Sequence, residues 1–114
     1  MVPLTVLTSV LAVWFAFLGV GKAIGAAPMV ERAAHVGFGL GVYRVIGALE
    51  LAGVIGLLLG LMLPALGALA AAGFLLLLTG AVAAHLRAGD RLSAVVPAIV
   101  SALVVVGYLI ALLR

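Results

Sequence analysis

Residues 43–63 read YRVIGALELAGVIGLLLGLML, an apolar run that contains one acid, Glu50, and ends just before Pro64. A helix of about 20 apolar residues, rising about 1.5 Å per residue, covers the roughly 30 Å of hydrocarbon in a bilayer. A charged side chain inside such a run is rare, because lipid solvates it poorly. The segment therefore predicts a membrane-spanning helix that carries one unusual polar group.

Three further apolar runs of similar length surround this one, at about residues 2–21, 65–85 and 93–113. The first run is too long for the core of a signal peptide and lacks a charged segment before it, so we interpret it as a retained span. Proline suits the first turn of a helix, which fits Pro64 before the third run. We therefore predict an all-α fold, a transmembrane four-helix bundle, with residues 1–114 forming a single transmembrane domain.

The composition excludes most soluble classes of protein. Of the 114 residues, 68% are hydrophobic and only 8% are charged, whereas a globular chain is about half apolar and about a quarter charged. The net charge of +3 comes without a basic run, so nucleic acid is not an expected partner. Cysteine is absent, which excludes disulfides, thiolate metal sites and thiol redox chemistry within this chain.

The connection between the first two spans, about residues 23–42, is the longest. A short helix is expected to begin at Pro28, and glycines at 37, 39 and 41 end it. We predict an interfacial helix here. Glu31 and His35 lie four residues apart, which places them on one helix face. Two ligands rarely hold a metal ion, so we expect a surface pair and predict no metal site.

The basic residues predict an orientation. The first-to-second and third-to-fourth connections lie on the same side of the membrane and carry five of the six cations, Lys22, Arg32, Arg44, Arg87 and Arg91. The positive-inside rule then places both connections in the cytoplasm and both termini outside. The expected location is the inner (plasma) membrane.

Glycines punctuate the second and third spans. Small residues allow membrane helices to approach closely. We therefore interpret the glycines at 47, 53, 56, 60, 67, 73 and 80 as packing positions. The fourth span is apolar around its circumference, so a surface that includes Gly107 and Tyr108 is expected to face lipid or a second copy of the chain.

The polar residues within or near the hydrocarbon are the candidate site. Glu50 shares a helix face with Gly47 and Leu57, so it points toward a packed side of the bundle. Lys22 ends the first span and His85 ends the third, near the same membrane half. We predict a polar intramembrane cluster of Lys22, Glu50 and His85. The supporting candidates are Tyr43, Arg44, Glu31, His35 and Arg87.

Each of these residues also has a plainer interpretation. Glu50 could serve only to pin helices together by pairing with Lys22 or His85. Lys22 could extend to the interface, and His85 could be an ordinary cation at a helix C-terminus. Asp90 is interpreted as a loop charge. Trp14 lies near the middle of its span, where it either packs in the core or forms a wall facing a ligand.

The order of these residues resembles that of the DoxX-like membrane proteins. The resemblance is carried by segments spread over the whole chain: Gly19-Val-Gly21-Lys22, Met29, Tyr43-Arg44-Val-Ile-Gly47-Ala-Leu-Glu50-Leu-Ala-Gly53, Gly80-Ala81, His85-Leu-Arg87 and Asp90. It implies a four-helix bundle. Family members are associated with subunits of thiosulfate:quinone oxidoreductases, with oxidative-stress complexes and with a receptor-assembly chaperone. This sequence matches at Lys22, Glu50 and His85, but it lacks any cysteine or cofactor-ligating cluster.

Three functional hypotheses follow. In the first, the chain is a small membrane subunit that anchors or assembles a partner complex, one linked to redox, quinone or sulfur chemistry. In the second, it binds a lipophilic small molecule such as a quinone or a lipid. In the third, the buried acid serves a proton-coupled transporter, with a homo-oligomer as the working unit. No catalytic residue is assigned, and free-standing catalytic activity is not expected.

Overall fold

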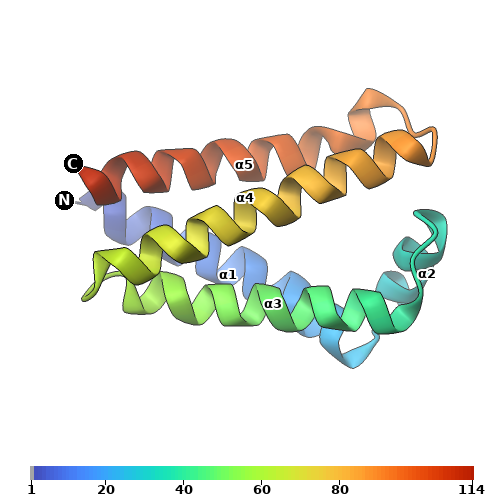
Figure 1. Ribbon diagram of the computed structural model, residues 1–114, viewed down its shortest axis with the longest axis horizontal. Helices are drawn as coiled ribbons and strands as arrows, with labels where there is room; N and C mark the ends of the chain where they lie inside the picture. The colour runs from blue at the N-terminus through green and yellow to red at the C-terminus, as the bar shows by residue number, and fades with distance from the viewer. Residues whose placement is uncertain (1) are drawn as a thin grey trace.

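The computed structural model describes residues 2–114, and their regular structure is entirely helical (Figure 1). The helices are α1 (Val2–Ile24), α2 (Ala27–His35), α3 (Leu40–Leu59), α4 (Pro64–Arg87) and α5 (Leu92–Leu113). All except α2 are long and apolar enough to cross a membrane. The predicted all-α fold with four long apolar helices is confirmed, and a short helix lies between the first two of them.

The main difference from the predicted helix ranges concerns α3. It begins three residues earlier and ends four residues earlier than the predicted range of 43–63. The ring of Pro64 disfavours helical backbone at the preceding residue, and Leu63 is extended, with φ −124° and ψ 91°. Residues 60–63 therefore form a turn, in which Gly60 caps α3. The C-terminal end of α1 also differs from the predicted range of about 2–21. The helix continues to Ile24 and stops at Gly25, whose φ of 69° few other residues tolerate.

The long helices form two pairs. Helix α1 packs along α3, and α4 packs along α5; the pairs meet where α3 contacts α4 and α1 contacts α5. Figure 1 shows the turn between α3 and α4 at the same end of the molecule as the start of α1 and the end of α5. We call this the narrow end, because the pairs diverge from it. The opposite, wide end carries α2 and the loop between α4 and α5.

The core lies between the two pairs. Its buried side chains are Leu11, Phe15, Val54, Leu57, Ala71, Phe74, Val105 and Tyr108. Phe15 of α1 stacks on Phe74 of α4, with ring centroids 4.0 Å apart and planes inclined by 19°. The outer surfaces carry many exposed leucine, valine and isoleucine side chains. Such an exterior is stable in lipid, because acyl chains are as apolar as these residues.

Some of the glycines allow the helices to approach closely, and others do not. A Cβ added at Gly56 would lie 2.8 Å from Cβ of Ala70, and one at Gly60 would lie 2.7 Å from Cα of Gly67. Helices α3 and α4 therefore touch almost backbone to backbone. The packing interpretation was wrong for Gly73 and Gly80: among residues 2–114, no atom of another helix lies within 4 Å of a Cβ built there.

Tyr108 corrects the predicted outer surface of the fourth span. Its side chain is fully buried, so it cannot face lipid or a second copy. Its hydroxyl lies against the contact between Gly60 and Gly67. Among residues 2–114 this hydroxyl has no hydrogen-bond partner. The bulky side chain occupies the space that the two glycines leave, and this links α5 to the turn between α3 and α4.

Candidate functional site

A buried ion pair joins α1 to α3. Nζ of Lys22 donates a hydrogen bond to Oε1 of Glu50 over 2.6 Å. The Glu50 side chain is only 2% exposed, and the Lys22 side chain is 14% exposed. Close helix contact permits this, because a Cβ at Gly47 would lie 2.7 Å from the Gly19 carbonyl oxygen. The carboxylate is therefore paired where water cannot solvate it.

Tyr43 lies beside this ion pair, one helical turn before Gly47 on α3. The ammonium of Lys22 lies 5.2 Å from the centroid of the Tyr43 ring, which is within range of a cation–π interaction. On its other side, Tyr43 contacts Phe38 in a tilted arrangement with centroids 6.4 Å apart. Tyr43 thus contacts both the ion pair and the segment between α2 and α3.

A second polar cluster lies at the wide end. Asp90, in the loop before α5, accepts hydrogen bonds from Nδ1 of His85 over 2.6 Å and from Nε2 of His35 over 2.7 Å. These two hydrogen bonds, the one from His85 above all, lower the pKa of Asp90 below its ordinary value of 3.8. The carboxylate is thus ionised at neutral pH and only accepts, so each of these ring nitrogens carries a proton.

A pocket of about 520 Å³ opens beneath α2. It is lined by Pro28, Glu31, Arg32, His35, Val36, Tyr43 and His85. Tyr43 separates this pocket from the ion pair of Lys22 and Glu50. Since Nδ1 of His85 is occupied by Asp90, the nitrogen of His85 that remains for the pocket is Nε2.

The structure brings together part of the predicted cluster. Lys22 and Glu50 contact each other, whereas His85 bonds to Asp90 and shares with Tyr43 the lining of the pocket beneath α2. Glu31 and His35 both line the pocket and are exposed on α2, and Nε2 of His35 is bound to Asp90; a pairing of these two side chains with each other stays a prediction. Arg44 and Arg87 are exposed and do not line this pocket.

Asp90 was missed as a partner because it was interpreted as a solvated loop charge. One local signal pointed to it: Gly89 follows the end of α4, and glycine there favours a left-handed turn. Gly89 has a φ of 79°, and the backbone N–H of Asp90 donates to the carbonyl of His85. This turn returns the carboxylate to the imidazole five residues earlier.

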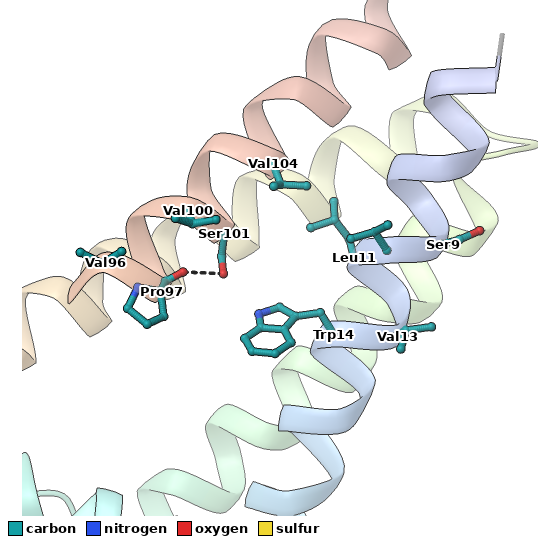
Figure 2. A pocket seen from close by; sticks show the side chains of 10 residues that line it. Ser9, Leu11, Val13, Trp14, Val96, Pro97, Val100, Ser101 and Val104 are labelled. Atoms are coloured by element: carbon teal, nitrogen blue, oxygen red, sulfur yellow. Dashed lines mark hydrogen bonds between the residues drawn. The ribbon is translucent and has the colours of Figure 1, made fainter. Parts of the chain in front are cut away.

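A different cavity, of about 760 Å³, lies between α1 and α5 (Figure 2). Its lining is apolar apart from Ser9 and Ser101, and the Ser101 hydroxyl donates to the carbonyl of Pro97 over 2.7 Å. Trp14 projects from α1 toward Pro97 and is 43% exposed (Figure 2). Of the two alternatives for Trp14, the structure therefore supports a wall residue rather than a core residue.

Within residues 2–114, no three histidine, aspartate or glutamate side chains come close enough together to hold a metal ion. Two side chains that reach a common carboxylate do not form a coordination shell, which typically needs three or four ligands.

The comparisons with known proteins support the family resemblance. The model of the DoxX-like family matches residues 6–107, which contain α2, α3 and α4 entirely and most of α1 and α5. This match confirms the resemblance that was seen in the glycines and polar residues of the sequence. In the two other comparisons, no curated protein and no solved structure matches the chain.

Proposed function

The chain belongs to the DoxX-like family, and from this premise we propose that it is a membrane protein that binds a lipophilic molecule of the quinone or lipid class by its polar end. The observation that carries the proposal is the pocket beneath α2. Its volume of about 520 Å³ falls in the range of about 300–1,000 Å³ that is usual for small-molecule sites.

The chemistry of the lining favours a ligand with hydrogen-bonding oxygens. Arg32 and the hydroxyl of Tyr43 are donors, whereas Nε2 of His85 is an acceptor when the ring is neutral. A carbonyl, hydroxyl or phosphate oxygen satisfies such groups. The ion pair of Lys22 and Glu50 lies behind the Tyr43 ring and supports it through the cation–π contact.

The proposal predicts that the ligand is lost when the polar lining is removed. Protein purified gently from native membranes is analysed by mass spectrometry that detects bound small molecules. Tyr43→Phe and His85→Leu are each expected to lower ligand occupancy severalfold, because each removes a hydrogen-bonding group from the pocket. Glu50→Gln is expected to lower it less, since Glu50 acts through Lys22 and Tyr43.

The control is Thr79→Val on α4, whose hydroxyl only donates to the carbonyl of Leu75 and is exposed. Its ligand occupancy should equal that of the parent. A parent protein that carries no small molecule, or variants of Tyr43 and His85 that retain it fully, would refute the proposed binding function.

A second candidate function, anchoring or assembling a partner complex, is favoured by the charges at the wide end. Arg32, Arg44, Arg87 and Arg91 are all exposed, and they lie on α2, at the start of α3, and around the loop before α5. The positive-inside rule assigns this end to the cytoplasm. Such a surface suits an acidic face of a partner protein.

This candidate predicts a partner that depends on the wide-end charges. Reversing two of them, Arg87→Glu with Arg91→Glu, is expected to abolish copurification of the partner from native membranes, because like charges across an interface repel. Arg114→Glu, at the other end of the molecule, is the matched control and should leave the partner bound. Isolation of the parent protein alone at native expression would contradict this role.

A further inference from the structure

The two helix pairs are held together very differently at their two ends. Toward the narrow end, α3 and α4 touch at Gly56 and Gly60, and near the middle of the bundle Phe74 of α4 stacks on Phe15 of α1. At the wide end, α2 packs on α1 and α3, with Met29 and Ala33 buried. Within residues 2–114, α2 makes no backbone contact with α4 or α5. Its link to them is the pair of hydrogen bonds on Asp90.

That link has a simple geometry. His35 is the last residue of α2, and it donates from Nε2 to one carboxylate oxygen of Asp90. His85, near the end of α4, donates from Nδ1 to the other oxygen. The carboxylate thus bridges the helix pair that carries α2 and the helix pair that carries His85. Both histidines also line the pocket beneath α2, so breaking the bridge would free two residues of its lining to move apart.

We propose that the bridge from His35 through Asp90 to His85 is a clasp that opens and closes the wide end of the bundle over this pocket. The narrow end acts as the hinge, since its glycine contacts leave the backbones of α3 and α4 almost touching. Control of ligand entry by the clasp rests on the proposed binding function, whereas the opening itself does not.

The clasp is weak enough to open because its outer half is exposed. The His35 side chain is 58% exposed, and hydrogen-bonded pairs at such positions contribute little net stability, since water competes for both partners. The inner half, between His85 and Asp90, is more protected and is also supported by the turn at Gly89. The bond from His35 is therefore the one that breaks when the wide end opens, and Asp90 stays with His85.

The proposal is tested by measuring the distance across the wide end. The chain has no cysteine, so spin labels can be attached at two introduced ones, Val30→Cys on α2 and Ser93→Cys on α5, both at exposed positions. Pulsed electron spin resonance on the full chain in lipid nanodiscs then gives the distance distribution. We expect the parent to show one dominant distance. Asp90→Ala and His35→Leu should each add a population at longer distance.

Two further variants separate the clasp from general damage. In His35→Gln, the side-chain amide can donate from about the position of Nε2, so the parent distribution is expected to return. Arg87→Gln removes a charge from the wide end, outside the pocket, without touching the bridge and should give the distance distribution of the parent. Parent-like distributions in both Asp90→Ala and His35→Leu would overturn the clasp. Longer distances in Arg87→Gln as well would overturn it too.

The same samples distinguish failure of the clasp from failure of the proposed binding function. The distance distribution needs no ligand, so it tests the clasp even if the parent carries no small molecule. If a ligand is present, it should be lost faster during washing from Asp90→Ala than from His35→Gln. An unchanged rate of loss together with a longer distance would refute control of access by the clasp.

Discussion

Lys22→Met is expected to destabilise the folded protein by about 3–5 kcal/mol, the range for removing one member of a buried ion pair. The carboxylate of Glu50 would remain 2% exposed with its partner gone. Neither water nor lipid could replace the lost hydrogen bond without opening the contact between α1 and α3. Reversible unfolding in mixed detergent micelles measures the change in free energy of unfolding.

The converse substitution should be milder. In Glu50→Leu the lysine loses its countercharge, but Lys22 is already 14% exposed and lies in the last turn of its helix, so its ammonium can extend toward the interface. The double variant Lys22→Met with Glu50→Leu is expected to be close to the parent in stability, since apolar replacement of a buried pair is often neutral. This double-mutant cycle therefore yields a large coupling energy.

The cycle also decides between the two interpretations of Glu50. If the double variant folds and still retains the ligand, the ion pair only pins α1 to α3. If it folds but loses the ligand, the charges support the pocket through Tyr43. A coupling energy near zero would instead show that Lys22 and Glu50 do not interact in the membrane-embedded protein. Neither residue would then belong to the candidate site.

The packed face of α3 could be predicted from the sequence because helical periodicity alone determines it. Gly47, Glu50, Val54 and Leu57 recur at spacings of three and four residues, and the structure buries all of them. The partnership of Glu50 with Lys22 was one of two predicted pairings. It follows from two features visible in the sequence: a lysine that ends the first span and an acid about two turns inside the second.

The roles of Gly73 and Gly80 could not be predicted in the same way. A soluble helix reveals its buried face by contrast with a polar face, but lipid and protein core are equally apolar. The periodicity of leucine in α4 therefore does not say which glycine faces a neighbour. Only the positions of α3 and α5 relative to α4 decide that Gly67 is buried and Gly73 is not.

The two hydrogen bonds of Asp90 join residues at very different separations in the sequence, so they could not be predicted equally well. The turn at Gly89, which returns Asp90 to His85, is local and was visible as a glycine after the helix. The bond from His35 to Asp90 joins residues 55 positions apart in the chain. It depends on how α2 folds back at the wide end. No local pattern of spacing contains that information, so the pairing of His35 with Glu31 was expected instead.

Gly47→Ala is expected to destabilise the protein, whereas Gly73→Ala should stabilise it. A Cβ at Gly47 would lie 2.7 Å from the backbone nitrogen of Ala23 and from the Gly19 carbonyl oxygen. These are backbone atoms of α1, so the helices must separate, at a cost of about 1–3 kcal/mol. At Gly73 a Cβ meets no atom of another helix within 4 Å among residues 2–114, and alanine gains up to about 1 kcal/mol of helix propensity.

Separation of α1 from α3 in Gly47→Ala should also weaken the ion pair. The Cβ of Lys22 is a third atom that would lie 2.7 Å from the added Cβ. Moving Lys22 outward lengthens its bond to Glu50, so part of the ion-pair energy should be lost in Gly47→Ala. The loss caused by Gly47→Ala is therefore expected to shrink when it is made in the Lys22→Met, Glu50→Leu background. An equal loss in both backgrounds would mean that steric overlap alone destabilises the variant. Stabilisation by Gly47→Ala to the same extent as by Gly73→Ala would refute the close contact between α1 and α3.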